Sequence, residues 1–174
     1  MVEFVNVTPG FAIGPQISSR DFEQLRAAGF ASVLNARPDD ESGEYLAAQD
    51  AEQLARANGL AYAHVPAENH GLFETELIDR FERALAELPK PVFAHCKTGT
   101  RTAILWALVA SRQYAVENVI AQLRSAGQEL DFLEQELRES AKATRRSPFR
   151  LKDDALLGLG QSQLRAGSNT RNDG

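Results

Sequence analysis

A short apolar strand, a polar loop and an apolar helix follow one another at residues 91–108, and the rest of the chain is organised around them. The strand reads Pro91–Ala94, with its proline at the first position, where a strand needs no ladder donor. The loop contains the chain's single cysteine, Cys96, and it ends at Arg101, in the first turn of an apolar helix. The pattern therefore predicts a buried strand that passes through a tight loop directly into a buried helix.

The cysteine loop, Cys96–Thr102, combines residues that suit a thiolate nucleophile beside a bound oxyanion. Backbone N–H groups at a helix N-terminus bind anions together with the helix dipole, and the same field favours the thiolate form of a cysteine. Gly99 permits a turn that a Cβ atom would obstruct, and Arg101 can hold two oxygens with its planar fork. Thr102 is expected to hydrogen-bond the sulfur or to support the loop. An unreactive buried cysteine is the alternative for Cys96 taken alone, but its neighbours favour the nucleophile.

The remainder of the chain alternates apolar strand patterns with amphipathic helix patterns, which predicts α/β layers around a largely parallel sheet. In such sheets, sites form at the carboxyl ends of strands, so Cys96, the loop Arg37–Glu41 and the loop Glu68–Glu74 are expected to meet at one crevice. Trp106 is predicted to lie in the core. Strands are predicted at residues 11–17, 31–36, 62–65 and 91–95, and helices at residues 18–28, 44–58, 74–87, 101–112, 116–125 and 129–138.

The segment His95–Thr102 resembles the phosphate-binding loop of cysteine-dependent protein phosphatases. More closely, the chain resembles the bacterial beta-lactamase-hydrolase-like phosphatases, also in Ser32–Glu41 and Ala63–Pro66, over roughly residues 10–138. The resemblance implies a dual-specificity-phosphatase-like fold, with a central, mostly parallel sheet flanked by helices. It also implies a hydrolase that cleaves a phosphate ester through a phosphocysteine intermediate. In that family, the residue at the position of His95 helps to fix the loop and its thiolate.

The spacing of the loop departs from that of protein phosphatases, which place five residues between cysteine and arginine. Here there are four, namely Lys97, Thr98, Gly99 and Thr100. Four is the spacing of rhodanese-type sulfurtransferases, and the close bacterial family shares it. A persulfide on Cys96 that passes sulfur to a thiol acceptor is therefore the alternative mechanism.

The loop that resembles the family's general-acid loop contains no aspartate in this chain. Glu68 is the nearest chemical replacement, with His70 behind it, and a solvated loop carboxylate without a catalytic role is the alternative for Glu68. A sulfurtransferase needs no such acid. Arg37 and Asp39 are expected to line the crevice, with Arg37 adding positive charge for an anionic substrate. A surface ion pair is the equal alternative for these two residues.

The composition of the chain limits the kinds of molecule that it can be expected to bind. The formal net charge of −5 argues against general nucleic-acid binding, and no apolar run approaches the length of about 18 residues that a membrane helix needs. A single cysteine suits a reducing compartment, so a cytoplasmic location is expected. The expected partner is a small anionic substrate, either a phosphate ester or a persulfide or thiosulfate-like species. No cofactor is expected, and the three histidines fit no standard zinc spacing.

Residues 1–140 are predicted to form one catalytic domain, and residues 141–174 a tail that is first basic and then without fixed structure. A third functional class stays open beside the two enzymes, a weakly catalytic module that binds a phosphorylated or anionic ligand. The oligomeric state and any protein partner are not indicated by the sequence.

Overall fold

The computed structural model describes residues 1–142. The predicted tail therefore lies outside the described residues, except for its first two residues, which end the last helix. The strands are β1 (Val5–Thr8), β2 (Phe11–Gly14), β3 (Ser32–Asn35), β4 (Ala61–His64) and β5 (Val92–His95). The helices are α1 (Asp21–Ala27), α2 (Ala48–Ala57), α3 (Thr75–Glu87), α4 (Thr100–Ala110), α5 (Val116–Ser125) and α6 (Glu134–Lys142), with 3-10 turns η1 (Asn69–Gly71) and η2 (Asp131–Leu133).

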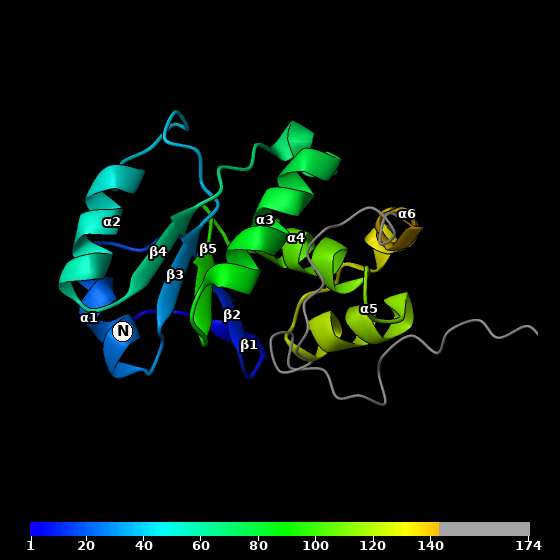
Figure 1. The fold of residues 1–174 in the computed structure, drawn as a ribbon, viewed down its shortest axis with the longest axis horizontal. Helices are drawn as coiled ribbons and strands as arrows, with labels where there is room; N and C mark the ends of the chain where they lie inside the picture. The colour runs from blue at the N-terminus through cyan, green and yellow to red at the C-terminus, as the bar shows by residue number, and fades with distance from the viewer. Residues whose placement is uncertain (143–174) are drawn as a thin grey trace, which may run out of the picture.

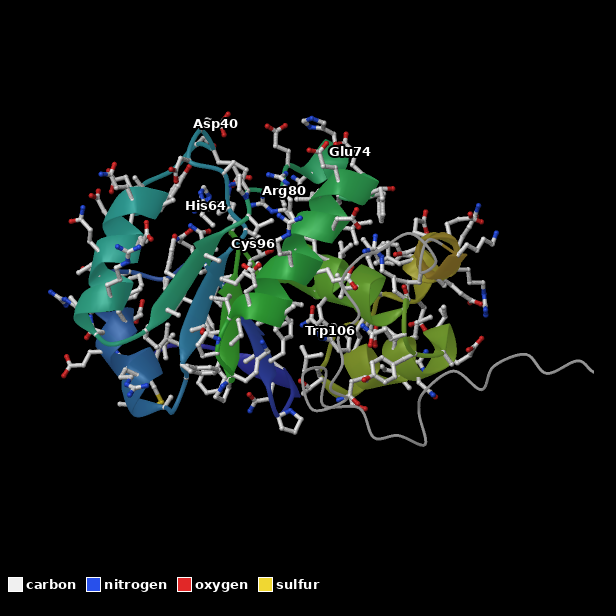
Figure 2. The ribbon with its side chains drawn as sticks, viewed as in Figure 1. Asp40, His64, Glu74, Arg80, Cys96 and Trp106 are labelled. Carbon is white, nitrogen blue, oxygen red and sulfur yellow. The ribbon has the colours of Figure 1, made fainter. Side chains whose placement is uncertain are left out.

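The five strands form one mixed sheet in the order β1-β2-β5-β3-β4, in which only β1 is antiparallel to its neighbour. The register pairs Gly14 with His95, His95 with Asn35, and Asn35 with His64. The last residues of the four parallel strands therefore stand in one row, and the loops that follow them leave from the same edge. Figure 2 shows His64 and Cys96 near this edge, below the loop of Asp40 and the start of α3 at Glu74.

Helices cover both faces of the sheet, α1 and α2 on one and α3 to α6 on the other (Figure 1). Side chains alternate between the faces as the strand period of two requires. In β3, Val33 joins the cluster under α1 and α2, whereas Leu34 joins the larger cluster under α3 and α4. In β5, Phe93 and Ala94 divide in the same way. The predicted α/β architecture with a mostly parallel sheet is confirmed.

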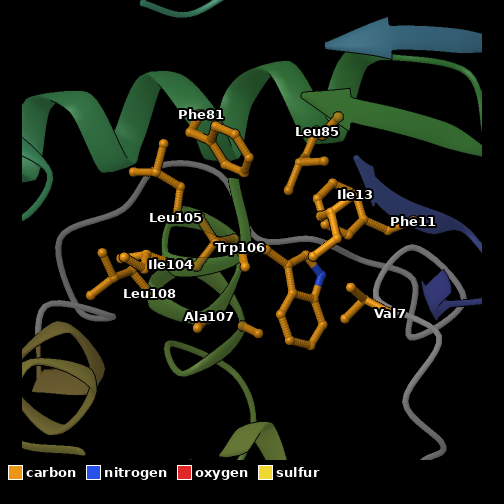
Figure 3. Packing of buried hydrophobic residues seen from close by; sticks show 14 of the residues in the cluster. Val7, Phe11, Ile13, Phe81, Leu85, Ile104, Leu105, Trp106, Ala107 and Leu108 are labelled. Carbon is orange, nitrogen blue, oxygen red and sulfur yellow. The ribbon is translucent and has the colours of Figure 1, made fainter. Parts of the chain in front are cut away.

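Helix α4, which follows the cysteine loop, is buried along its whole length except at its first residue. Trp106 is fully buried, as predicted, and its ring stacks on Phe11 with the centroids 6.1 Å apart. Figure 3 shows Trp106 among Val7, Phe11 and Ile13. A helix enclosed on all sides has little freedom to shift, so its N-terminus is a rigid platform for the cysteine loop.

The helix predicted at residues 44–58 begins four residues late, at Ala48. Tyr45, which the pattern placed on the helix's core face, instead lies in the preceding loop, where its hydroxyl is 2.7 Å from Glu41 O and 2.9 Å from Pro38 O. Asp39 Oδ1 accepts the N–H of Ala48 at 2.9 Å and so serves the first turn of α2. Side chains from the loop, rather than helix periodicity, set where α2 begins.

Two other predictions needed correction. Sequence reasoning missed β1, a four-residue edge strand in which apolar and polar residues alternate but burial does not, since its first two residues are exposed and its last two are buried. The helix predicted at residues 129–138 is instead the 3-10 turn η2 followed by α6, which begins at Glu134. Leu130 and Leu133 are both buried, and a 3-10 turn brings residues three apart onto one side. None of the helices formed by residues 1–142 is both long and apolar enough to cross a membrane.

Candidate active site

Cys96 follows the last residue of β5, and α4 begins four residues later at Thr100. The thiol is 1% exposed, and its Sγ accepts the backbone N–H of Gly99 at 3.1 Å. Gly99 has φ +94°, a left-handed conformation that turns the chain back over the sulfur before the helix begins. The sulfur therefore lies at a helix N-terminus, where the unpaired N–H groups and the helix dipole stabilise negative charge.

Two carbonyl groups of the loop are anchored on its outer side. Lys97 O accepts the N–H of Gln16 at 3.2 Å, and Gly99 O accepts the hydroxyl of Thr102 at 2.7 Å. Since C=O and N–H point in opposite directions across a planar trans peptide, the N–H groups of Thr98 and Thr100 point away from these anchors. Thr102 therefore supports the loop, which is one of the two roles expected for it, and the sulfur takes its hydrogen bond from an amide.

The loop rests directly on the end of β2. A Cβ atom at Gly99 would lie 3.1 Å from the carbonyl oxygen of Gly14, so the two backbones meet with no space for a side chain. At Gly14 itself, a Cβ atom would approach Glu3 O and a ring atom of Phe93 to 2.6 Å each. Both positions need glycine because of close backbone approach, and this contact holds the cysteine loop against the sheet.

Arg101, in the first turn of α4, is buried. Its Nη1 donates to Ala67 O at 2.7 Å and also to Glu41 Oε1, and its Nη2 donates to Glu41 Oε2 at 3.0 Å. A guanidinium has five N–H donors, so the edge formed by Nε and the second Nη2 hydrogen is left for another acceptor. Burial acts to lower the pKa of Arg101, but the hydrogen bond and charge of Glu41, together with the charge and side-chain hydrogen bond of Cys96, raise it overall. Arg101 is thus a fixed cation, and the donors that Glu41 and Ala67 leave open lie close to the Cys96 sulfur.

Glu41 stands between two arginines. Its Oε2 also accepts Arg37 Nε at 3.0 Å, and the Arg101 hydrogen bond, with Arg37 and both charges adding, lowers the pKa of Glu41 against the opposing effect of burial. Arg37 is itself buried: Nη1 donates to Gln16 at 3.2 Å, Nη2 to Ser42 O at 3.0 Å, and its guanidinium carbon lies 3.6 Å from the ring centroid of Tyr45. The cation expected to face the substrate is therefore bound on several sides by protein groups.

His95 is buried beside the cysteine, with its ring stacked on Phe93 at 6.0 Å between centroids. Burial lowers the pKa of His95 to about 4, and the nearby charges of Arg37 and His64 act in the same direction, while the Cys96 backbone acts against them. The imidazole is consequently neutral at neutral pH. His64, at the end of β4, places Nε2 2.8 Å from the carbonyl oxygen of Arg37, which is a structural contact.

Glu68 and His70 lie on the exposed loop before α3. The Glu68 carboxylate is 2.9 Å from His70 Nε2, and the two side chains are 54% and 81% exposed. Glu68 directly follows Ala67, whose carbonyl oxygen contacts Arg101, so this loop does reach the cysteine loop as predicted. Lys97, Thr98 and Thr100 are exposed, and the two threonine hydroxyls are 3.2 Å apart.

Cys96 contacts Gly99 and Arg101 in the structure, and Arg37 is linked to Arg101 through Glu41. Asp39 is instead committed to the first turn of α2. Sequence reasoning missed Glu41 and Gln16 as members of the site. Glu41 stood within the recognised segment Ser32–Glu41, and its position four residues after Arg37 was the available signal. Gln16 carried no signal. Among residues 1–142, no group of three or more histidine, cysteine, aspartate or glutamate side chains is arranged to hold a metal ion.

The known proteins that this chain resembles in sequence share one family name. The profile of the phosphatase-like domain of beta-lactamase hydrolase-like protein matches residues 3–113. A beta-lactamase hydrolase-like protein of Agrobacterium fabrum is 36% identical over 104 residues, covering 60% of this chain and 24% of the relative. One from Xylella fastidiosa is 37% identical over 108 residues, covering 62% and 25%. The chain spans about a quarter of the length of the curated relatives it matches.

Solved structures share the fold at low sequence identity. A putative phosphatase of Neisseria meningitidis is 23% identical, with a TM-score of 0.69 over 78% of this chain and 96% of that one. Kinase associated phosphatase, solved with serine in place of its catalytic-site cysteine, is 15% identical, with a TM-score of 0.65 over 84% and 96%. The core catalytic domain of a PP-IP phosphatase from S. cerevisiae, in complex with citrate, is 15% identical, with a TM-score of 0.59 over 83% and 88%.

The fold is thus that of dual-specificity and related phosphatases, and the family profile covers more than half of the chain, from β1 to just beyond α4. The chain belongs to the family of phosphatase-like domains of beta-lactamase hydrolase-like proteins.

Proposed function

We propose that this phosphatase-like domain hydrolyses a phosphate monoester with Cys96 as nucleophile. The observation that carries the proposal is the position of the Cys96 sulfur. It accepts an amide N–H at the N-terminus of α4, beside an arginine that interacts with the sulfur through the edge that Glu41 and Ala67 leave open. Negative charge on the sulfur and on the oxygens of a bound phosphate is favoured there. The catalytic-site cysteine of kinase associated phosphatase, a protein of the same fold, supports the assignment by analogy.

In the proposed reaction the Cys96 thiolate attacks phosphorus, forming an S–P bond while the bond between phosphorus and the leaving oxygen breaks. Arg101 and the amides of Lys97–Arg101 hold the phosphoryl oxygens. Glu68, in its acid form, gives its proton to the leaving oxygen. Water then attacks phosphorus, its proton passes to the Glu68 carboxylate, and the S–P bond breaks to regenerate the thiolate and release phosphate.

The function is tested by phosphate release from p-nitrophenyl phosphate. We expect Cys96→Ser to abolish turnover and Arg101→Lys to lower kcat/KM by at least about a hundredfold, because lysine cannot reproduce the fork. Arg56→Met is the matched control, since it removes an exposed arginine that pairs with Glu52 on α2. Turnover that survives Cys96→Ser would exclude the phosphocysteine mechanism.

The role of Glu68 is tested separately with leaving groups of different basicity. A nitrophenolate needs little protonation when it leaves, whereas phenolate and alkoxide do. Glu68→Gln is therefore expected to leave p-nitrophenyl phosphate hydrolysis nearly unchanged and to lower phenyl phosphate hydrolysis by about a hundredfold. An equal effect on both substrates would remove Glu68 from the role of general acid, and His70→Gln then tests the other polar group of that loop.

Sulfur transfer is the second candidate, and the four-residue spacing between Cys96 and Arg101 favours it. In that reaction the Cys96 thiolate attacks the outer sulfur of a thiosulfate or persulfide donor, whose S–S bond breaks to release sulfite or the donor thiolate, and an acceptor thiolate then takes that sulfur and regenerates the Cys96 thiolate. Incubation with thiosulfate followed by intact mass measurement tests it, with Cys96→Ala as the control. A gain of one sulfur on the wild-type chain alone, without phosphate release in the parallel assay, would replace the phosphatase proposal. If neither reaction occurs, anion binding remains as the function of the loop.

A further inference from the structure

We infer that Arg37 is a positioning residue, which holds Glu41 so that the remaining edge of the Arg101 guanidinium, beside the Cys96 sulfur, faces the substrate anion. The sequence alone left two roles open for Arg37, namely positive charge in the crevice or a surface ion pair. Its side chain is 5% exposed, and all three of its nitrogens donate to protein acceptors, on Gln16, Glu41 and Ser42. Because its donors are used in this way, Arg37 is expected to affect substrate binding only through a neighbouring residue.

The neighbour is Glu41, whose carboxylate is shared. Oε2 accepts one hydrogen bond from Arg37 Nε and one from Arg101 Nη2, each at 3.0 Å, while Oε1 contacts Arg101 Nη1. Glu41 lies in a loop without regular structure, and its side chain is 25% exposed. A glutamate in such a position loses considerable rotamer freedom when it is held in one geometry. The bond from Arg37 removes that freedom before any ligand binds.

Arg37 is itself held by separate parts of the chain. Gln16, in the segment after β2, accepts Nη1, and the same residue's backbone N–H anchors the cysteine loop at Lys97 O. Tyr45 covers the guanidinium, and its hydroxyl binds the carbonyls of the loop that carries Glu41. Arg37 therefore ties both loops of the site to one buried cation, and displacement of either loop would disturb Arg101.

The net charge of Arg37, Glu41 and Arg101 together leads to the same conclusion. Two guanidinium groups and one carboxylate carry a net charge of +1, which balances the thiolate of Cys96. Without Arg37, the charge of Glu41 would cancel that of Arg101 and leave no net positive charge. The carboxylate would also be free to turn toward the anion site. Both effects weaken the attraction of the cysteine loop for an anion, the first through charge and the second through geometry.

Alkylation of Cys96 tests the inference, and because the chain has one cysteine the reaction is unambiguous. Iodoacetate and iodoacetamide attack the same thiolate, so the ratio of their rates cancels the thiolate fraction and reports the attraction for an anion. We expect Arg37→Met to lower this ratio about tenfold, and Arg37→Lys, which keeps the charge but not the fork, to lower it by a smaller factor. Arg56→Met, which breaks an exposed pair of the same i,i+4 spacing, is the control and leaves the ratio unchanged.

A double-mutant cycle with Glu41→Gln separates positioning from a general loss of structure. If Arg37 acts mainly through Glu41, adding Arg37→Met to Glu41→Gln lowers the ratio by a clearly smaller factor than adding Arg37→Met to the wild type, since only the loss of one charge then remains. An unchanged ratio in folded Arg37→Met, or independent effects that multiply in the double variant, overturns the inference. Should Arg37→Met fail to fold, the same cycle is run with Arg37→Lys, judged by the same two criteria.

The inference rests on the proposed anion-binding role of the cysteine loop, but alkylation requires no turnover. A wild-type ratio no higher than that of glutathione would mean that the loop attracts no anion, which removes both the proposed function and the role of Arg37. A high wild-type ratio that Arg37→Met preserves removes the role of Arg37 alone.

Discussion

At the scale of single residues, burial determines which form of a side chain the site contains. His95 is 1% exposed, and burial lowers its pKa to about 4, so it is a neutral neighbour of Cys96. Glu41 shows the opposite case, since two guanidinium groups stabilise its charged form and lower its pKa. The cysteine loop is thus flanked by a neutral imidazole and by a carboxylate that is already paired.

The state of His95 makes stability depend on pH. In the unfolded chain the imidazole takes a proton near pH 6.5, and in the folded protein only near pH 4, so acid favours unfolding between these values. His95 therefore lowers the free energy of unfolding by up to about 3 kcal/mol as pH falls from 7 to 4, and has no further effect below pH 4. Urea unfolding of wild type and His95→Gln at several pH values measures it. The carboxylates contribute equally to the pH dependence of both proteins, so their contribution cancels in the difference between the two free energies of unfolding. A difference that does not vary with pH contradicts the prediction.

At the scale of elements, the position of the cysteine loop depends on the contact between two backbones. Gly99 and Gly29 both have φ +94°, but only Gly99 has neighbouring atoms where a Cβ would lie, with Gly14 O at 3.1 Å. Gly29→Ala is expected to lower the free energy of unfolding by about 1 kcal/mol, because alanine is strained at positive φ. Gly99→Ala also displaces the loop from β2. It should therefore lower the free energy of unfolding by more than Gly29→Ala does, and it should also slow the alkylation of Cys96.

The two glycine variants form a matched pair, since they share the backbone strain and differ in the contact. Thermal or urea unfolding measures the stability of each, and iodoacetamide measures the thiol. Equal losses of stability, with Cys96 alkylated at the wild-type rate in both, would mean that the loop does not depend on its close contact with β2.

The start of α2 is a second property of elements that depends on one side chain. Asp39 Oδ1 accepts the N–H of Ala48 at 2.9 Å, across the loop that carries Glu41. Asp39→Ala leaves that N–H without its acceptor and is expected to lower the free energy of unfolding by about 1 kcal/mol, as for the loss of a helix cap. Asp40→Ala, at the exposed neighbouring residue, is the control, and urea unfolding compares the two. Equal stability of both variants would mean that solvent replaces the aspartate.

At the scale of the whole molecule, a buried ion pair joins the helices on the face that supports the cysteine loop. Arg112, after α4, contacts Glu82 of α3, and both side chains are almost completely buried; Asp79 is 2.8 Å away from the same arginine. Removing one partner of a buried pair leaves the other charge poorly compensated. Glu82→Ala is therefore expected to lower the free energy of unfolding by about 3 kcal/mol.

The control for this variant is Glu52→Ala, which breaks the exposed pair with Arg56 and is expected to change stability little. Urea unfolding of both variants beside wild type compares them. If Glu82→Ala is as stable as Glu52→Ala, then the pair does not join α3 to the end of α4 energetically, and the packing of Phe81 and Leu105 does so alone.

The sequence by itself determined the features that depend on neighbouring residues. The strand, loop and helix around Cys96, the glycine turn and the positions of most elements follow from periodicity, turn residues and the spacing of Cys96 and Arg101. These are local properties, so one stretch of chain contains the whole signal. The edge strand β1 and the exact start of α2 were missed although their partners lie nearby in the chain, because a hairpin pairing and a side-chain acceptor leave no mark in the periodicity.

Only the tertiary structure decided how the site is held. Arg101 contacts Glu41 and Ala67, which are 60 and 34 positions away in the sequence, and Gln16 joins them through Arg37. These segments meet because the parallel register places the ends of β2, β5 and β3 in one row. No local pattern contains that register, since packing of both faces of the sheet sets it. The sequence thus shows the candidate nucleophile, whereas the fold alone shows which groups contact the arginine beside it.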